Sequence, residues 1–252
     1  MTTSATAGAT QPAPGLAGQT VVVIGGSSGI GLETARRARA EGAGVVITGR
    51  TPEHLERAAA ELGTSRTAAF DATDPAALER FFCDLPDPVD HVMVTAGGQY
   101  YAPLAEMDFT QAGRALDEHL LGALRVARYA TGKVRPAGSL LFITGTGARR
   151  PGIGNIIAGI EAAALPAITA NLALELAPVR VNLLAAGFVD TPLSARLLGD
   201  DLDARRAQLR ATLPIRRVVG PADVAALAVH IMTNTALTGA TYDVDGGEQV
   251  VP

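Results

Sequence analysis

Three glycines at a fixed spacing provide the first chemical signal in the sequence. Gly25, Gly29 and Gly31 follow the apolar run Thr20–Ile24 and open a segment with helical periodicity. The first glycine permits a tight turn, the second lets a phosphate approach the backbone, and the third lets a helix pack closely against a strand. The helix N-terminus offers N–H groups and partial positive charge to an anion. This spacing predicts a dinucleotide-binding turn, the alternative being a glycine-rich turn that binds nothing.

The end of the second apolar run carries Arg50. A site that prefers NAD places a carboxylate near this point, where it binds the 2′-hydroxyl of the ribose. A guanidinium can pair instead with the 2′-phosphate of NADP, and the hydroxyls of Ser27 and Ser28 can add hydrogen bonds. We therefore expect NADP(H) to be preferred over NAD(H). The alternative is that Arg50 belongs to a solvated loop.

Short apolar runs alternate with longer segments of helical period. Most of the runs are continuous in β-branched residues and Leu, which is typical of strands buried on both faces of a parallel sheet. They cover Thr20–Ile24, Val45–Thr48, Thr67–Phe70, His91–Thr95, Ser139–Thr144, Val179–Leu184 and Ala240–Val244. Helices are predicted at 31–41, 53–62, 75–84, 109–131, 155–177, 193–211 and 221–233. The alternation predicts an α/β fold with a doubly wound parallel sheet (Rossmann-like) in a single domain.

Composition excludes several classes of protein. The 252 residues carry 21 Lys and Arg against 25 Asp and Glu, a balance that argues against a nucleic-acid partner. The single cysteine, Cys83, allows neither an intrachain disulfide nor a thiolate metal cluster, and no other metal site is expected. No apolar run approaches the roughly 20 residues of a membrane span, and the N-terminus lacks a signal-peptide pattern. We expect a flexible tail over 1–16, one dinucleotide-binding domain over 17–252, and a cytoplasmic protein.

Several ordered motifs between about residues 17 and 249 resemble those of the short-chain dehydrogenase/reductase family. Besides the glycine turn, they are Thr95-Ala96-Gly97-Gly98, Ala186-Gly187-Phe188-Val189-Asp190-Thr191-Pro192 and Val244-Asp245-Gly246-Gly247. By this resemblance Asp71 would meet the adenine and Thr191 the nicotinamide carboxamide. The resemblance implies cofactor contacts at Gly25, Ser27, Ser28, Gly29, Ile30, Gly31, Arg50, Asp71, Ala72, Thr95, Ala96, Gly97, Thr144, Gly187, Val189 and Thr191.

The chain departs from the family where the family keeps its Ser, Tyr and Lys. In the family the Tyr phenol is the acid or base, and the neighbouring ammonium lowers its pKa from about 10 towards neutrality. Alignment on Leu172-Ala173-Leu174-Glu175-Leu176 puts Gly145 at the Ser position, Ala158 at the Tyr position and Ala162 at the Lys position. No Tyr or Lys occurs anywhere in 137–177, so a shift of register restores neither. The chain's one lysine, Lys133, precedes the fifth strand and is expected at the opposite edge of the sheet.

Four side chains are candidates to replace the missing groups. His119 falls where the family has an Asn and could relay or donate a proton near neutral pH; the alternative is a hydrogen-bonded core histidine. Glu161 could become an acid if it faces the cofactor, or it could be a solvated helix residue. Tyr100, next to Tyr101 after the fourth strand, could donate a proton or merely cover the cleft. Thr146 could donate a hydrogen bond to a carbonyl.

Two classes of function therefore remain open. The first is an oxidoreductase that transfers hydride between NADP(H) and a small organic substrate that does not need the usual tyrosine acid, such as an iminium or an activated enone. The second is a catalytically silent relative that keeps cofactor binding for sensing or assembly. The resemblance also implies a homodimer or homotetramer through the helices at 109–131 and 155–177, and a lid over 193–212.

Overall fold

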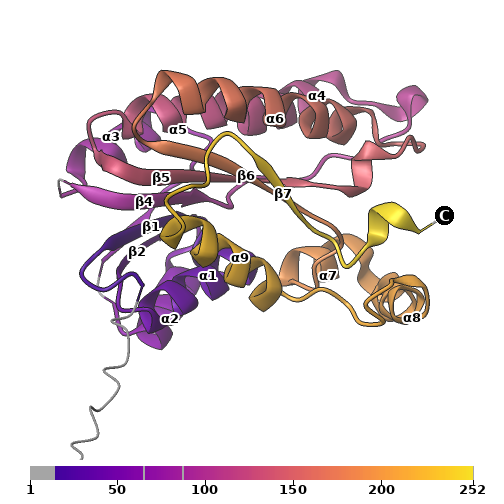
Figure 1. Ribbon diagram of the computed structural model, residues 1–252. Coiled ribbons are helices and arrows are strands. Elements are labelled where there is room, and N and C mark those ends of the chain that lie inside the picture. Colours follow the sequence, from indigo (N-terminus) through magenta and orange to yellow (C-terminus); the bar gives the residue numbers. More distant parts are fainter. Residues whose placement is uncertain (1–14, 65, 87, 252) are drawn as a thin grey trace, which may run out of the picture.

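The computed structural model describes residues 15–64, 66–86 and 88–251, and its centre is a seven-stranded parallel sheet (Figure 1). The strand order is β3-β2-β1-β4-β5-β6-β7. The strands are β1 Thr20–Ile24, β2 Gly44–Gly49, β3 Thr67–Ala69, β4 Val89–Val94, β5 Val134–Gly145, β6 Arg180–Ala186 and β7 Thr241–Val244. The predicted doubly wound parallel sheet is confirmed, and each predicted strand is present with ends shifted by a few residues.

Helices cover both faces of the sheet (Figure 1). One face packs against α1 (Gly29–Ala40), α2 (Pro52–Leu62) and α9 (Pro221–Thr233). The other packs against α3 (Pro75–Asp84), α5 (Gly122–Ala130) and α6 (Ile156–Glu175). The central strands are buried on both sides, which explains why their sequences are continuously apolar instead of alternating.

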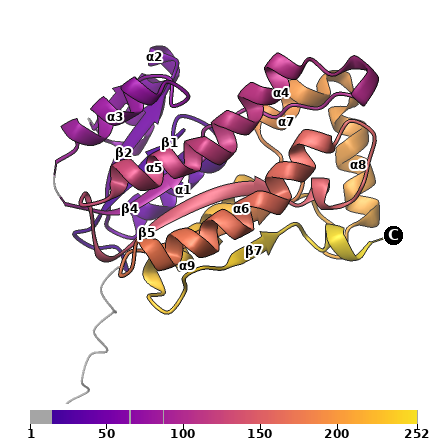
Figure 2. The same cartoon turned by 90° about the horizontal axis from the view of Figure 1, so that it is seen from above.

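The remaining helices gather beyond the carboxyl ends of the strands, as Figure 2 shows for α4, α7 and α8. Their bounds are α4 Phe109–Leu116, α7 Pro192–Leu198 and α8 Leu202–Thr212. Short 3-10 turns complete the fold: η1 Leu104–Glu106, η3 Gly147–Arg149, η4 Gly199–Asp201 and η5 Glu248–Val250. Strand β1 lies between β2 and β4, so the chain winds in opposite directions from it. In open α/β sheets the crevice at such a point holds the ligand.

Three sequence expectations need correction. The helix predicted at 193–211 is two helices, because Gly199 has a φ of 50° and a ψ of −122°, which no α-helix can contain. The helix predicted at 109–131 contains a π-helical turn, η2 (Asp117–Leu121), between α4 and α5. Residues 1–14 of the predicted tail lie outside the described residues, but Leu16 is fully buried and its N–H donates to the Glu41 carbonyl at 3.1 Å. The tail boundary at residue 16 was therefore wrong.

Helix α6 is long and apolar enough to cross a membrane, judged by length and composition alone. Its most apolar 18-residue stretch has a mean hydropathy of 1.6. This differs from the expectation that no apolar run approaches the length of a membrane span. Its inner face carries Leu165 and Leu172, which pack into the core beside β5 and β6. The same criterion is met by core helices of globular domains. Its outer face exposes Ile160 and Leu174, and the expected dimer or tetramer contact through this helix stays a prediction.

A buried histidine lies near the amino ends of the strands, at the edge of the sheet opposite to the crevice. His91 on β4 is 3% exposed. Its Nε2 lies 2.7 Å from Gln19 Oε1 and its Nδ1 lies 2.8 Å from Ser139 Oγ. A neutral ring satisfies both contacts by donating to Gln19 and accepting from Ser139. Burial, together with the positive charge of Arg180, lowers the pKa of His91 to about 4.

We predict that His91 makes the stability of the protein depend on pH. The pKa is about 4 in the folded state and near 6.5 when unfolded, so the unfolded state binds more protons between these values. The free energy of unfolding should be unaffected by His91 above about pH 7 and fall by about 3 kcal/mol between pH 6.5 and 4. Urea denaturation across this range should show a shallower pH dependence in His91→Asn. The control His54→Asn, at an exposed histidine, should retain the wild-type dependence; equal slopes in both variants would contradict the assignment.

Candidate functional site

A cleft of about 620 Å³ opens at the crevice where β1 and β4 end. Loops after β1, β2, β4, β5 and β6 line it, and α7 closes one side. Every residue to which the resemblance assigned a cofactor contact lines this cleft. The fold therefore brings these residues together from separate parts of the chain, and their individual roles remain a prediction.

The glycine turn sets how close α1 comes to the sheet. Gly25 has a φ of +93°, and a Cβ there would lie 2.7 Å from the Ala96 backbone nitrogen. A Cβ on Gly31 would lie 2.5 Å from Oγ1 of Thr95, whose hydroxyl donates to the Gly25 carbonyl at 3.1 Å. The first turn of α1 carries no acidic side chain, and Ser28, its N-cap, lines the cleft. The helix N-terminus is thus open to an anion, and these residues fit the pyrophosphate of a dinucleotide.

The far end of the cleft suits an adenosine ribose. Arg50 is exposed just past the end of β2 and lines the cleft together with Ser27 and Asp71. The Asp71 carboxylate accepts hydrogen bonds from the backbone nitrogen of Thr73 at 3.0 Å and from its hydroxyl at 2.9 Å. The Asp71 carboxylate is therefore held in place. The end of β2 carries the positive charge of Arg50 where a site for NAD would carry a carboxylate.

The other end is bounded by the start of α7. Thr191 is its N-cap: Oγ1 accepts from the Ser194 backbone nitrogen at 3.2 Å, and the Thr191 N–H donates to Ser194 Oγ at 2.8 Å. Ser194 Oγ also donates to the Val189 carbonyl, 2.9 Å away. This capping box fixes the Thr191 hydroxyl at the edge of the cleft, where the resemblance expects a nicotinamide carboxamide.

His119 and Glu161 form a buried pair between two helical segments. His119 belongs to the π-helical turn η2 and Glu161 to α6, and both line the cleft. Nδ1 of His119 lies 3.1 Å from Oε1 of Glu161 and 3.2 Å from the Ala115 carbonyl oxygen. The two side chains are 13% and 7% exposed. Both acceptor oxygens contact Nδ1, so this geometry favours the tautomer that carries its proton on Nδ1.

The electrostatics of the pair favour a charged ring. Burial by itself lowers the pKa of His119, but the hydrogen bond and the negative charge of Glu161, with the Ala115 carbonyl and Glu118, outweigh it and raise the pKa above 6.5. Nε2 faces Gly97: a Cβ built on that glycine would lie 2.5 Å from Nε2. Gly97 also has a φ of +143°, so this position requires glycine both for its backbone and for the ring beside it.

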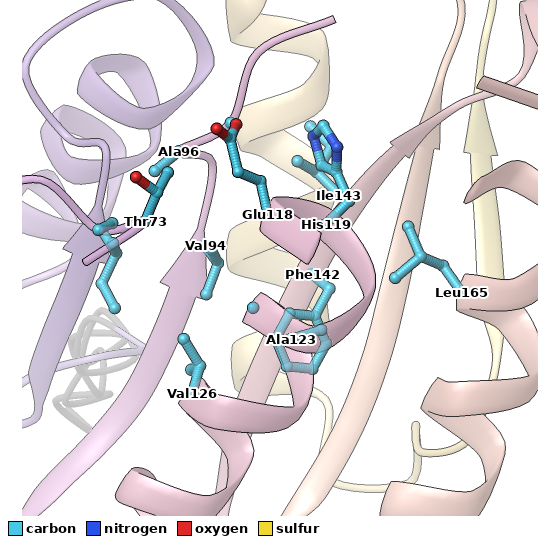
Figure 3. Close-up of a pocket in the computed structure, with 14 residues that line it drawn as sticks. Thr73, Val94, Ala96, Glu118, His119, Ala123, Val126, Phe142, Ile143 and Leu165 are labelled. Carbon is cyan, nitrogen blue, oxygen red and sulfur yellow. The ribbon is translucent and has the colours of Figure 1, made fainter. Parts of the chain in front are cut away.

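A small side cavity of about 40 Å³ lies beside this ring (Figure 3). Figure 3 shows His119 and Glu118 at its polar edge, while Val126 and Phe142 are among the apolar side chains around the rest of it. Gly97 and His119 line both this cavity and the cleft, so the histidine lies on the border between the two. The imidazole therefore has an apolar neighbour on one side and a carboxylate on the other.

The positions aligned with the family's Ser, Tyr and Lys carry no acid or base. Gly145 lines the cleft at the end of β5. Ala158 and Ala162 are each 6% exposed on α6. Glu161 lies on the same face of that helix, at the spacing of one turn from Ala158. It thus adds a carboxylate on the helix face where the family has a phenol and an ammonium.

Two of the four predicted catalytic candidates come together and two do not. Thr146 is fully buried, does not line the cleft, and its Oγ1 has no hydrogen-bond partner among the described residues. Tyr100 also lies off the cleft, where its hydroxyl oxygen accepts from the Asp108 nitrogen at 2.8 Å. No sequence pattern separates Tyr100 from Tyr101, because neighbouring side chains in an irregular segment point in directions that only tertiary contacts decide.

Tyr101 is the tyrosine that lines the cleft. Its hydroxyl donates to Gln99 Oε1 at 3.1 Å. Partial burial and the negative charge of Glu161 raise the pKa of this phenol above 10, so it stays protonated at neutral pH. Tyr101 can therefore donate a hydrogen bond to a ligand, and no group in the described part of the chain lowers the pKa of its phenol. No cluster of potential metal ligands occurs within residues 15–64, 66–86 and 88–251.

Comparison with known proteins assigns the family. A family model described as enoyl-(acyl carrier protein) reductase matches residues 24–249. The short-chain dehydrogenase/reductase ATR9 of Stachybotrys chlorohalonatus is 30% identical, over 93% of this chain and 98% of its own length. The chain therefore belongs to the short-chain dehydrogenase/reductase family, whose members are oxidoreductases that bind a nicotinamide cofactor and act on small molecules.

Solved structures agree with this assignment. The MalC reductase/Diels-Alderase of Malbranchea aurantiaca superposes with a TM-score of 0.87 at 25% identity, covering 95% of this chain and all of that one. A small-chain dehydrogenase in complex with NADPH superposes with a TM-score of 0.79 at 29% identity, covering 91% of this chain and 97% of that one. The fold is thus shared along nearly the whole chain.

We predict that Glu161→Gln lowers the pKa of the His119 ring below that of the wild type. The burial that disfavours the imidazolium remains, while the carboxylate that stabilises it is lost. Titration of the ring by NMR measures this directly and needs no substrate. Glu118→Gln is the matched control, because Glu118 affects the ring through its charge alone and should lower the pKa less. Equal shifts in the two variants would refute a specific His119–Glu161 contact.

Proposed function

We propose that the protein is an NADP(H)-dependent oxidoreductase in which His119, held by Glu161, takes the place of the family's tyrosine acid. The observation that carries the proposal is the 3.1 Å contact between His119 Nδ1 and Glu161 Oε1 at the cleft. A carboxylate that holds one ring nitrogen leaves the other free for proton transfer, an arrangement known from catalytic histidines. Hydride transfer to or from a small organic substrate would be the reaction.

The chain's own residues would supply orientation and a proton. The bound cofactor provides the hydride. The backbone of the glycine turn and the N-terminus of α1 would bind the pyrophosphate, and Thr191 would orient the nicotinamide end. His119 would donate a proton from Nε2 to the substrate atom that gains negative charge, while Glu161 stabilises the imidazolium beforehand. Tyr101 would donate a hydrogen bond to the substrate at the mouth of the cleft.

This set of residues favours substrates that need little acid assistance. An imidazole can donate a proton, but no serine or ammonium is present at Gly145 or Ala162 to hold the oxygen of an unactivated ketone. An iminium carbon accepts hydride without needing a proton. When an activated enone accepts hydride, the negative charge moves onto an enolate that solvent can protonate. We therefore infer that such acceptors are reduced faster than simple ketones. The MalC relative, whose name joins a reductase with a Diels-Alderase, supports a broader chemistry for this fold.

The preference for NADP(H) rests on Arg50. Its guanidinium lies past the end of β2, and Ser27 lines the cleft beside it. A 2′-phosphate would gain an ionic hydrogen bond there that a 2′-hydroxyl cannot form. The relative that is solved with NADPH supports the same cofactor.

A second function follows from the absence of the family's Ser, Tyr and Lys. With Gly145, Ala158 and Ala162 at the family's catalytic positions, the protein would be a silent, cofactor-binding sensor or assembly partner if the His119–Glu161 pair does not transfer protons. Cofactor binding without hydride turnover on any acceptor would distinguish this function from the first. In either case we expect a cytoplasmic homodimer or homotetramer.

For an acceptor that needs a proton, we predict that His119→Gln lowers kcat/KM at least about 100-fold, the usual contribution of a general acid. Because the protonated ring is the acid, the wild-type rate should fall as the pH rises through the raised pKa of His119, and the variant should lose this dependence. NADPH oxidation with a panel of ketones, enones and cyclic iminium ions measures both. Exposed His54→Asn is the control. Robust ketone reduction that persists in His119→Gln would show that another group is the acid.

We predict that Arg50→Ala weakens NADPH binding by about tenfold or more and leaves NADH binding nearly unchanged, since only the 2′-phosphate pairs with the guanidinium. Calorimetric titration of both cofactors into both proteins gives the four dissociation constants needed. Equal affinity of the wild type for NADPH and NADH would remove the role assigned to Arg50.

A further inference from the structure

After its last strand the chain turns back against the loops that line the cleft. Residues 245–250, the C-terminal turn, follow β7 and end in η5, which lies near α7 and α8 (Figures 1 and 2). The Asp245 carboxylate accepts from the backbone nitrogens of Gly247 at 2.8 Å and Gln249 at 3.1 Å. This internal bonding makes the C-terminal turn a preformed unit that presents the side chain of Glu248.

Glu248 joins the loop after β6 to helix α8. Its Oε2 accepts from the backbone nitrogen of Phe188 at 3.2 Å, and its Oε1 accepts from Nη2 of Arg205 at 2.8 Å. The guanidinium carbon of Arg205 also lies 5.8 Å from the centre of the Phe188 ring. A Cβ on Gly187 would lie 2.7 Å from Oε2, so glycine is what lets the carboxylate reach the backbone behind the cleft.

The same turn is tied to the loop after β5. Gln249 Nε2 donates to the Thr146 carbonyl at 3.2 Å, and Arg150 donates to the Gln249 carbonyl at 2.6 Å. Arg149 forms two hydrogen bonds with Asp243 on β7, at 2.6 and 2.8 Å. The C-terminal turn therefore connects three segments that surround the site: the loops after β5 and β6, and the helix that follows α7.

We propose that Glu248 is a positioning residue that sets the nicotinamide end of the cleft and latches α8 to the loop that lines it there. Gly187 and Phe188 line the cleft, and Glu248 supports them from behind. Its ion pair with Arg205 holds α8 to this same backbone. The loop and the helix are thus fixed by one carboxylate, and its loss frees both together. The part of this proposal that concerns cofactor release rests on the proposed function; the part that concerns the loop and helix does not.

The chemistry of the latch makes it sensitive to salt. Arg205 and Glu248 are 32% and 21% exposed, so ions reach the pair, and a salt concentration of about 0.5 M shortens the screening length to about 4 Å. A second contact restrains the same helix, because Arg206 forms two hydrogen bonds with Asp190 at 2.7 and 3.0 Å. Loss of the Glu248 contact should consequently loosen α8 without detaching it.

Amide hydrogen exchange of the protein without cofactor tests the latch directly. In Glu248→Gln and in Arg205→Met we expect exchange in residues 185–191 and 202–212 to be faster by at least about threefold, while the core strand β4 is unchanged. Met keeps an apolar stem beside Phe188 but removes the ion pair. Glu61→Gln, which removes the remote Arg36–Glu61 pair on α1 and α2, is the control and should leave both segments at the wild-type rate. Wild-type exchange of both segments in Glu248→Gln would overturn the proposal.

Release of NADPH, followed by stopped-flow fluorescence, tests the consequence for the site. We expect release to be about tenfold faster in each single variant and no faster in the double variant, because both substitutions remove one interaction. High salt screens the phosphate contacts in every variant, so it should speed release from the wild type by a larger factor than from the double variant, which has no latch left to screen. Additive effects of the two substitutions would overturn a shared latch. A protein that binds no NADPH would contradict the proposed function, whereas the exchange experiment would still decide the latch.

Discussion

The structure depends on the close approach of α1 to the ends of β1 and β4. Gly31 leaves no room for a side chain beside Thr95, and the Thr95 hydroxyl bonds the turn that Gly25 makes possible. This contact fixes the helix N-terminus over the point where the strand order reverses from β1. The crevice formed there then receives its other walls from the loops after β2, β4, β5 and β6, so that one backbone constraint decides where a ligand can bind.

The chemistry at the substrate end follows from a second constraint, the burial of charge. A carboxylate whose side chain is 7% exposed, such as Glu161, needs a partner, and with Ala158 and Ala162 beside it on α6 the partner must come from another element. The π-helical turn in the segment after α4 supplies His119. The extra residue of such a turn redirects the side chains around it, and π-helical turns are frequent at functional sites. In the function we propose, this imidazole and carboxylate would replace the phenol and the ammonium that the resemblance expects.

The sequence predicted most of the fold because its signals are local. Continuous apolar runs located the strands, and the glycine spacing located the cofactor turn. The break at Gly199 was missed because the residues on both sides continue a helical pattern, and the conformation of one glycine ended it. Leu16 was placed in the tail because its burial depends on a contact with the turn after α1, far along the chain.

The site was predictable only in part, for a similar reason. His119 and Glu161 could each be chosen by position, but their pairing links residues 42 apart on different helical segments, and no sequence pattern encodes it. Tyr101 was not distinguished from Tyr100, and Glu248 has no motif at all. These residues are defined by where loops meet in space, which only the folded chain specifies.

Charge at the substrate end follows from the same replacement. An ammonium at the position of Ala162 would add a positive charge there, which stabilises an oxyanion and repels a cation. Here the charges of His119 and Glu161 cancel when the ring is protonated and sum to −1 when it is neutral, and Glu118 adds a further negative charge that acts on the ring. A cationic acceptor near the pair would lower the fraction of protonated ring, because like charges repel. The cationic acceptor would then face the Glu161 carboxylate and a neutral imidazole, whereas a neutral acceptor would face the imidazolium. Under the proposed function, the protonation state of this one pair would adapt the site to either kind of acceptor, which a fixed ammonium would not do.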